Sequence, residues 1–190
     1  MDKSRRKGRL FVLAGPSGVG KGTLRAKALS NMEDLTYSVS CTTRQPREGE
    51  RDGVDYCFLT MQEFEERIAG GFFLEHAVVH GNRYGTLLKD VERETEAGRD
   101  VLLEIDVQGA RQVRELMPDS VLIFVAPPSL EALEKRLRLR KTESEEKIAL
   151  RLKNAKIEME LSSEFDRVIT NDELEQTCKE LHDILLSYRK

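Results

Sequence analysis

Short runs of apolar residues alternate along this chain with segments whose apolar residues recur at helical spacing. The continuous apolar runs are typical of buried strands and cover residues 10–14, 101–106 and 121–126. Segments with helical spacing follow them at residues 24–29, 110–117 and 130–139. Strands that alternate with helices predict an α/β fold, in which helices flank a parallel sheet and ligands bind at the carboxyl ends of the strands.

The middle of the chain departs from this alternation and predicts an inserted lobe. Short strand-like runs occupy residues 37–41, 56–59 and 72–80, a turn at 81–82 leads to residues 83–86, and a polar loop spans 44–55. Thr60 and Glu63 have the spacing of a capping box, which predicts a helix that ends at Gly70. We therefore expect a small α/β lobe over about residues 40–87.

The last third of the chain predicts a charged lid and a return to the core. Ser129 is expected to cap the helix at 130–139, and a segment dense in charge, the predicted lid, covers about residues 138–151. Thr142 and Glu145 form a second capping-box pattern, which predicts a helix that runs to about residue 161. A last strand and helix are expected at 168–170 and 174–188. The chain then forms one domain, residues 1–190, with core segments at about 9–39, 88–137 and 152–190.

Composition and charge narrow the class of protein. The chain has 190 residues, of which 39% are hydrophobic and 34% charged, as expected of one soluble globular domain. Its net charge of -3 argues against a general nucleic-acid binder, and the basic cluster at residues 3–9 is expected to be a solvated, frayed tail rather than a nucleic-acid arm. The apolar run after that cluster is too short for a signal-peptide core, and no run approaches the roughly 18 apolar residues of a membrane span. Three scattered cysteines indicate the reducing cytoplasm: Cys41, Cys57 and Cys178.

A glycine-rich loop follows the first predicted strand and has the spacing of a phosphate-binding loop. Its glycines allow backbone N–H groups to converge on phosphate oxygens, and Lys21 adds a mobile positive charge. The alternative is a glycine-rich turn that only joins a buried strand to a helix. The candidate ATP-binding residues are Gly15, Pro16, Ser17, Gly18, Val19, Gly20, Lys21, Gly22 and Thr23.

This loop departs from the usual pattern at one position. The consensus has Ser or Thr directly after the lysine, where its hydroxyl reaches a magnesium ion, but this chain has Gly22 there and Thr23 one place later. Whether Thr23 binds the metal or only contacts a phosphate stays open at this stage.

The kind of phosphate chemistry is narrowed by the rest of the chain. A GTPase needs a base-reading Asn-Lys-x-Asp motif, which the sequence lacks. The polar loop instead carries three arginines, Arg44, Arg47 and Arg51, which suit either an anion site or an ordinary solvated loop. A second lobe with arginines, tyrosines and an acid fits an acceptor that itself bears a phosphate.

From about residue 9 to residue 187 the chain resembles the guanylate kinases of the bacterial type. The similar segments are 15–23, 38–50, 55–56, 73–75, 84–86, 104–109, 126–129, the arginine-rich lid and 170–172. The resemblance implies transfer of the γ-phosphoryl group of Mg-ATP to GMP, with ADP and GDP as products. The alternatives are another nucleoside monophosphate kinase and a non-catalytic guanylate-kinase-like module that binds proteins.

The resemblance also implies roles for the residues of the lobe. Ser40, Glu75 and Thr86 would recognise guanine, and the GMP phosphate would be held by Arg44, Arg47, Tyr56 and Tyr84. Guanine presents N1–H and N2–H side by side, so one carboxylate can accept both hydrogen bonds. Adenine lacks that pair of donors and would leave Glu75 unpaired.

The remaining roles concern the metal and the transferred group. Glu104 and Asp106, on one face of the strand at 101–106, would lie near GMP and Mg²⁺ and act through water. In the lid, Arg136, Arg140 and Arg151 would neutralise the transferred phosphoryl group. The resemblance favours Arg140 and Arg151, which join Lys21 and Arg44 as the catalytic set. No general base is needed, because the acceptor oxygen of GMP is already ionised.

Overall fold

The computed structural model describes residues 6–79, 81–139 and 144–189. Its elements in chain order are β1 (Leu10–Ala14), α1 (Lys21–Asn31), β2 (Leu35–Tyr37), β3 (Cys41–Thr42), β4 (Cys57–Phe58), α2 (Met61–Ala69), β5 (Phe73–Val79), β6 (Asn82–Leu87), α3 (Leu88–Glu96), β7 (Asp100–Glu104), α4 (Val107–Leu116), β8 (Val121–Ala126), α5 (Leu130–Leu139), α6 (Glu145–Glu160), the 3-10 helix η1 (Leu161–Glu164), β9 (Arg167–Thr170) and α7 (Leu174–Ser187). Within these residues we find no helix with the length and apolar character that a membrane crossing requires.

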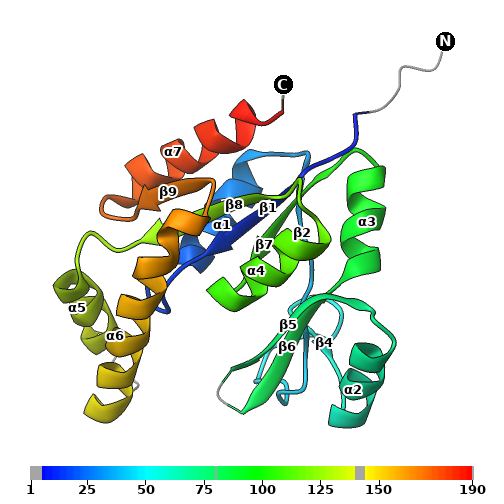
Figure 1. Ribbon diagram of the computed structural model, residues 1–190, viewed down its shortest axis with the longest axis horizontal. Coiled ribbons are helices and arrows are strands. Elements are labelled where there is room, and N and C mark those ends of the chain that lie inside the picture. Colours follow the sequence, from blue (N-terminus) through cyan, green and yellow to red (C-terminus); the bar gives the residue numbers. More distant parts are fainter. Residues whose placement is uncertain (1–5, 80, 140–143, 190) are drawn as a thin grey trace.

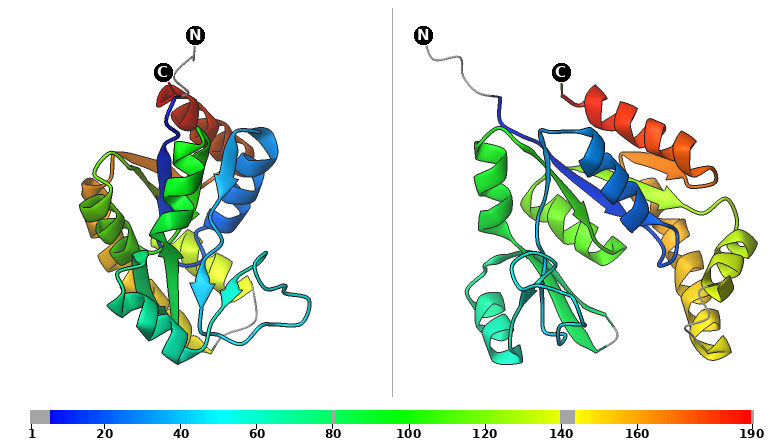
Figure 2. Two further views of the ribbon diagram at one scale, coloured as in Figure 1. Left: turned by 90° about the vertical axis from the view of Figure 1, so that its right-hand side faces the viewer. Right: turned by 180° about the vertical axis from the view of Figure 1, so that it is seen from behind.

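The central sheet is parallel and has the strand order β2-β7-β1-β8-β9. Every residue of β1 is buried, because helices cover both faces of the sheet. Phe11 and Leu13 pack against α1 and α7, which lie on the near face in the view from behind (Figure 2). Val12 packs on the opposite face with residues of α3 and α4. The predicted α/β fold with a helix-flanked parallel sheet is confirmed.

A second sheet, of order β4-β3-β6-β5, lies together with α2 below the central sheet in Figure 1. The β5–β6 hairpin is antiparallel, and α2 closes over it by stacking Phe64 on Phe73, with 4.4 Å between the ring centroids. The capping box predicted for α2 is present: Thr60 Oγ1 accepts a hydrogen bond from Glu63 N, and Glu63 accepts one from Thr60 N. In Figure 1, α5 and α6 occupy the other side of the molecule from this second sheet.

Two of the predicted strands have different limits in the structure. The run at 37–41 is not one strand, because β2 ends at Tyr37 in the central sheet and β3 begins at Cys41 in the second sheet. The run at 101–106 ends early: β7 stops at Glu104, and Asp106 caps α4 by accepting a hydrogen bond of 2.7 Å from Gly109 N. The sequence predicted that Glu104 and Asp106 share one face of a strand. This prediction was wrong, because Asp106 lies beyond the end of β7.

Two end regions also need correction. Residue 142 lies outside the described residues. The N-cap of α6 is Ser144, and Glu145 is the first residue of the helix rather than the third, so the predicted pairing of residues 142 and 145 is not the one that starts α6. Near the N-terminus, Arg6 donates a hydrogen bond of 2.7 Å to the buried Asp100, and Arg9 N donates to the same oxygen at 2.8 Å. Residues 6–9 are thus held against the sheet, whereas the sequence predicted a frayed tail. The cap at Ser129 is confirmed by its bond of 3.1 Å from Ala132 N.

Candidate active site

A cleft of about 700 Å³ lies at the carboxyl ends of β1 and β7, where a parallel sheet places its ligands. The phosphate-binding loop forms one wall, the second sheet another and α6 a third. The structure brings most of the predicted site residues to this cleft: Gly15, Ser17, Lys21, Gly22, Ser40, Tyr56, Glu75, Tyr84, Glu104, Asp106 and Arg151 line it.

The phosphate-binding loop has a backbone that requires glycine. Gly15 has φ of +139°, and a Cβ atom there would lie 2.3 Å from the carbonyl oxygen of Val125. Lys21 Nζ donates hydrogen bonds to the Gly15 and Pro16 carbonyl oxygens at 2.6 and 3.2 Å. Burial lowers the pKa of Lys21, and the nearby carboxylate of Glu104 opposes that change. The loop thus curls around the ammonium group, which is the arrangement expected of a phosphate cradle.

The far side of this loop is held by residues from the end of the chain. Asn171 Nδ2 donates a hydrogen bond of 2.7 Å to the Val19 carbonyl oxygen. Arg136, a candidate lid arginine, donates to the carbonyl oxygens of Val19 and Asn171 at 3.3 and 2.8 Å. Arg136 therefore contacts the loop backbone and does not line the cleft.

Gly22, which stands where phosphate-binding loops usually have Ser or Thr, lies next to an acidic side chain. A Cβ atom at this position would lie 3.6 Å from Glu104 Oε2, so the usual hydroxyl of a phosphate-binding loop would sit beside that carboxylate. Arg25, one helical turn after Lys21, forms an ion pair of 3.4 Å with Glu104 and lies over the Tyr37 ring, 4.3 Å from its centroid. Arg25 and Tyr37 line the cleft, but sequence reasoning missed both. The i, i+4 spacing of Arg25 from Lys21 was the available signal.

Two predicted base-reading residues are paired directly. Glu75 of β5 and Thr86 of β6 are opposite each other in the hairpin, and Thr86 Oγ1 donates a hydrogen bond of 2.6 Å to Glu75 Oε1. Both are buried, with Glu75 only 4% exposed. The register shifts between Phe73 and Glu75, which is the kind of irregularity that re-aims a side chain.

The environment of Glu75 disfavours the ionised form of its carboxyl group. Burial raises the pKa of its carboxyl from 4.5 to about 7, while the Thr86 hydrogen bond opposes this and the charge of Asp106 adds to it. Ser40, the third residue of the predicted group, lines the same cleft. Gln112 on α4 fixes this wall, because its amide accepts a hydrogen bond of 3.0 Å from His76 N and donates one of 2.9 Å to His76 O.

The predicted phosphate-holding residues form a cluster at the edge of the cleft. The Arg44 guanidinium lies 5.3 Å from the Tyr56 ring centroid, and the Tyr56 and Tyr84 rings are 6.0 Å apart. Glu50 accepts a hydrogen bond of 2.9 Å from Arg44 Nη2 and one of 2.8 Å from Arg47 N, and the first of these raises the pKa of Arg44. Arg47 is exposed on the same loop, and neither arginine lines the cleft in this structure.

The carboxylates suit a hydrated metal better than a fully protein-bound one. Among the described residues there is no group of three or more His, Cys, Asp or Glu side chains placed to hold a metal ion. Glu104 and Asp106 nevertheless both line the cleft beside the phosphate-binding loop. Mg²⁺ keeps several waters and binds nucleotide phosphates, so two such acids fit it without direct ligation by a third.

The lid residues are only partly described. Arg140 lies outside the described residues. Arg151 is on α6, and its Nη1 donates a hydrogen bond of 3.0 Å to Ser17 Oγ of the phosphate-binding loop. The same helix brings Leu150, Asn154 and Glu158 to the cleft, and α4 contributes Gln108, all of which sequence reasoning missed. In the sequence, a polar residue of a helix looks the same whether it faces solvent or a cleft, so only the position of the helix in the fold identifies these residues.

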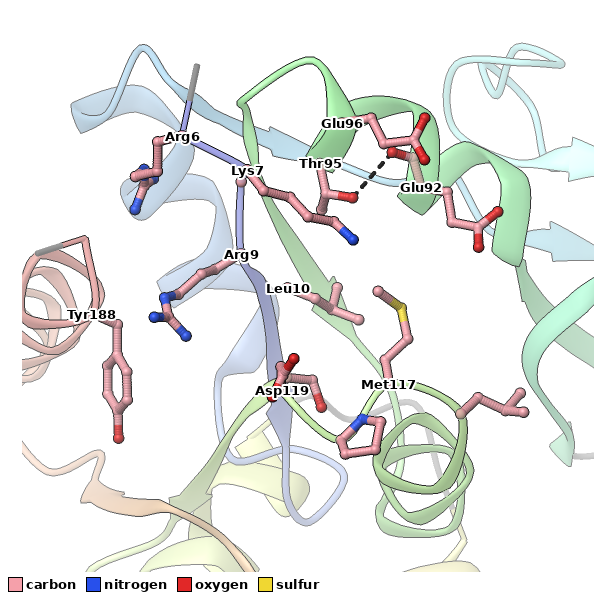
Figure 3. A pocket seen from close by; sticks show the side chains of 14 residues that line it. Arg6, Lys7, Arg9, Leu10, Glu92, Thr95, Glu96, Met117, Asp119 and Tyr188 are labelled. Carbon is pink, nitrogen blue, oxygen red and sulfur yellow. Dashed lines mark hydrogen bonds between the residues drawn. The ribbon is translucent and has the colours of Figure 1, made fainter. Parts of the chain in front are cut away.

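A second cavity, of about 630 Å³, lies at the opposite ends of the strands (Figure 3). Arg6, Lys7 and Arg9 line it from one segment, and Glu92 and Glu96 of α3 from another (Figure 3). Arg6 is already paired with Asp100. None of the predicted site residues that the structure describes lines this cavity, so the chemistry belongs to the cleft at the carboxyl ends.

The fold and the cleft together define a class of protein. A buried parallel strand that leads into a glycine-rich loop, with the loop lysine at the start of a helix, is the arrangement of the phosphate-loop nucleotide-binding proteins. The family model described as guanylate kinase matches residues 7–188, and the chain belongs to the guanylate kinase family. The expected family, and with it the expected enzyme class, a kinase, are confirmed.

Individual relatives agree with this assignment. The chain is 51% identical over 178 residues to the guanylate kinase of Fusobacterium nucleatum, covering 94% of this chain and 96% of the relative. It is 50% identical over 190 residues to that of Bifidobacterium longum, covering 97% of each. The crystal structure of guanylate kinase from Anaplasma phagocytophilum is similar with a TM-score of 0.78 and 36% identity, over 97% of this chain and 87% of that one.

Proposed function

We propose that this protein transfers the γ-phosphoryl group of Mg-ATP to GMP, giving ADP and GDP. The observation that carries the proposal is the buried Glu75, which lines the same cleft as the phosphate-binding loop and accepts a hydrogen bond from Thr86. A buried carboxylate that lacks a basic partner is costly, and guanine N1–H and N2–H are two adjacent donors that would satisfy it. The carboxylate therefore selects for guanine among the nucleotide bases.

On the acceptor side, each group of residues has one task. Ser40, Glu75 and Thr86 recognise guanine by hydrogen bonds. Arg44 and Arg47 bind the GMP phosphate with the hydroxyl groups of Tyr56 and Tyr84, since guanidinium groups suit phosphate oxygens. Before GMP binds, Arg44 donates a hydrogen bond to Glu50, and the GMP phosphate replaces Glu50 as the acceptor.

On the donor side, residues 15–23 bind the ATP phosphates through backbone N–H groups and Lys21. When bound, Mg²⁺ supplies positive charge to the phosphates that flank the transferred group. Glu104 and Asp106 hold it through water, and Thr23 contributes to the phosphate end of the loop. Arg140 and Arg151 neutralise the transferred phosphoryl group together with Lys21 and Arg44. Catalysis is thus positioning and charge stabilisation, without a general base.

The proposal includes closure of the cleft over the substrates. Arg44 and Arg47 do not reach the cleft in the structure, so the lobe over residues 40–87 and the lid over 138–151 close on the substrates and exclude water.

The proposed cellular location is the cytoplasm. Cys41, Cys57 and Cys178 are free thiols in the structure and would stay reduced there.

A test must separate this proposal from the two alternatives. Purified protein is mixed with ATP, Mg²⁺ and GMP, and the nucleotides are separated by chromatography. Equal amounts of ADP and GDP are expected. Lys21→Met should lower turnover by about three orders of magnitude, because it removes charge that acts on the transferred group. Lys27→Met is the matched control, since Lys27 is on the same helix and pairs with Glu175 outside the cleft.

The outcomes are distinct. Absence of GDP from the wild-type protein would support the protein-binding module. Phosphorylation of AMP or of a pyrimidine nucleotide in place of GMP would support another nucleoside monophosphate kinase.

A further inference from the structure

Arg25 of α1 lines the cleft between the phosphate-binding loop and the second sheet. It follows Lys21 by about one helical turn. Its guanidinium carbon lies 4.3 Å from the ring centroid of Tyr37, the last residue of β2. The chain then runs from β2 into the second sheet through Ser40, which lines the same cleft. Arg25 thus adjoins both halves of the site.

The order of the strands places Arg25 on the acceptor side of the phosphate-binding loop. The loop follows β1, and β1 lies between β7 and β8 in the central sheet. On the β8 side the loop backbone is held by Arg136 and Asn171. Arg25 instead contacts Glu104 and Tyr37, which end β7 and β2 on the other side. That side leads into the lobe over residues 40–87.

The Arg25 guanidinium is held in place, but its donors are not used. Its side chain is 30% exposed, and 3.4 Å separates its Nη1 atom from Glu104 Oε2. Charge-assisted hydrogen bonds between such groups are shorter, about 2.7–2.9 Å. Among the residues that the structure describes, the Arg25 side chain makes this ion pair and the Tyr37 contact but no hydrogen bond. A ring face attracts the positive charge without accepting the N–H groups as an oxygen would.

Gly22 contributes to this arrangement. A Cβ atom at this position would lie 3.6 and 3.7 Å from the two carboxylate oxygens of Glu104, so a serine hydroxyl there would come within reach of them. With glycine at position 22, no hydroxyl is present to compete with Arg25 for Glu104. The loose ion pair fixes the guanidinium at the cleft wall and leaves its planar set of donors for an anion, and phosphate oxygens match that geometry.

We propose that Arg25 binds the phosphate of GMP, as a further residue of the acceptor site. This inference deepens the proposed function and rests on it. Arg44 and Arg47 do not line the cleft in the structure, whereas Arg25 does. Arg25 therefore contacts the phosphate before the lobe over residues 40–87 closes, and Arg44 and Arg47 add their contacts on closure.

The test compares GMP with guanosine, which lacks the phosphate. The dissociation constant of GMP is measured by calorimetry without ATP, and that of guanosine by its competition with GMP. Arg25→Met should weaken GMP binding by about 10- to 100-fold, because a charge-assisted contact is lost, and leave guanosine binding unchanged. Arg25→Lys, which keeps the charge but not the planar donors, should recover part of the affinity. Arg111→Met is the matched control, since Arg111 pairs with Glu164 outside the cleft.

A second comparison asks whether Arg25 acts only by neutralising Glu104. Loss of Arg25 leaves the Glu104 carboxylate without its ion-pair partner, and that negative charge would itself repel a phosphate. Arg25→Met is therefore also made in a Glu104→Gln background. A direct contact with the phosphate predicts that GMP binding still weakens by about tenfold or more in that background.

Three results would overturn the inference: equal GMP affinities of Arg25→Met and Arg111→Met, equal losses of GMP and guanosine binding in Arg25→Met, or disappearance of the Arg25→Met effect in the Glu104→Gln background. Failure of the proposed function is a different result, because the wild-type protein would then form no GDP from ATP and GMP.

Discussion

Thr86 Oγ1 donates a hydrogen bond of 2.6 Å to Glu75 Oε1 across the β5–β6 hairpin, and both residues are buried, with Glu75 lining the cleft. The hydroxyl fixes the orientation of the carboxylate before any ligand binds. Since the pKa of Glu75 is raised to about 7, the acid is only partly ionised at neutral pH. Binding of a base with two adjacent N–H donors would favour the ionised form, so recognition and ionisation are coupled.

The first prediction concerns pH. Between pH 8 and pH 6 the ionised fraction of Glu75 falls about tenfold in the free protein, given its pKa of about 7. The KM for GMP should rise over this interval as pH falls. Because GMP itself also gains a proton near pH 6, Glu75→Gln serves as the reference, and its KM should depend less on pH. Identical pH profiles for the two proteins would exclude Glu75 from base recognition.

The second prediction concerns stability. A raised pKa means that the folded state binds the proton more tightly than the unfolded state. The stability contributed below pH 4.5 is therefore lost as pH rises to about 7. Glu75→Gln, which cannot ionise, should exceed the wild type in free energy of unfolding at pH 8, by up to about 3 kcal/mol. Urea unfolding at pH 8 and pH 5 checks this, and the difference should shrink at the lower pH. A less stable variant at pH 8 would contradict the account.

The third prediction tests the GMP phosphate site. Arg44→Lys keeps the charge but loses the planar pair of donors, so the KM for GMP should rise by about 10- to 100-fold while the KM for ATP stays constant. Arg83→Lys is the control, because Arg83 is in the same lobe and pairs with Glu65 outside the cleft. Steady-state kinetics with each substrate varied in turn gives both constants. Equal effects of the two substitutions would remove Arg44 from the site.

Much of this site was predictable because its signals are local. The phosphate-binding loop is read from nine successive residues, and Lys21 lies where that pattern places it. The pairing of Glu75 with Thr86 was not available in that way, because it depends on the hairpin register and its irregularity near Phe73. The strand predicted at 37–41 failed for a similar reason, since its two halves join different sheets. Glu158 has no local signature in the sequence, and only the placement of α6 brings it to the cleft.

The fourth prediction separates two tasks of Asp106. Its side chain caps α4 through Gly109 N and also lines the cleft as a charged group. Asn caps helices about as well as Asp, so Asp106→Asn should change the free energy of unfolding by less than about 0.5 kcal/mol. The loss of charge should raise the Mg²⁺ concentration needed for half-maximal rate. Asp106→Ala should lose both properties. An unchanged Mg²⁺ dependence in Asp106→Asn would exclude the metal role.

The fifth prediction concerns the link between the core and the second sheet. Gln112 makes two hydrogen bonds to the backbone of His76, the residue after Glu75. Gln112→Leu should lower the free energy of unfolding by about 1–3 kcal/mol, because two backbone groups lose their partners. It should also raise the KM for GMP more than the KM for ATP. Thermal unfolding and steady-state kinetics check both expectations, and equal rises in the two constants would contradict a specific effect on the base-recognising wall.

The central claim is that GMP is the preferred phosphoryl acceptor, and a competition measures it directly. ATP labelled with ³²P at the γ-position is mixed with equal concentrations of GMP, AMP, CMP and UMP, Mg²⁺ and the wild-type protein, and the labelled products are separated at early times. The buried Glu75–Thr86 pair predicts that nearly all transferred label appears in GDP, since selection against a base that leaves a buried acid unpaired can reach about 10⁴-fold. Label distributed evenly among the four diphosphates, or found mainly in ADP, would contradict it.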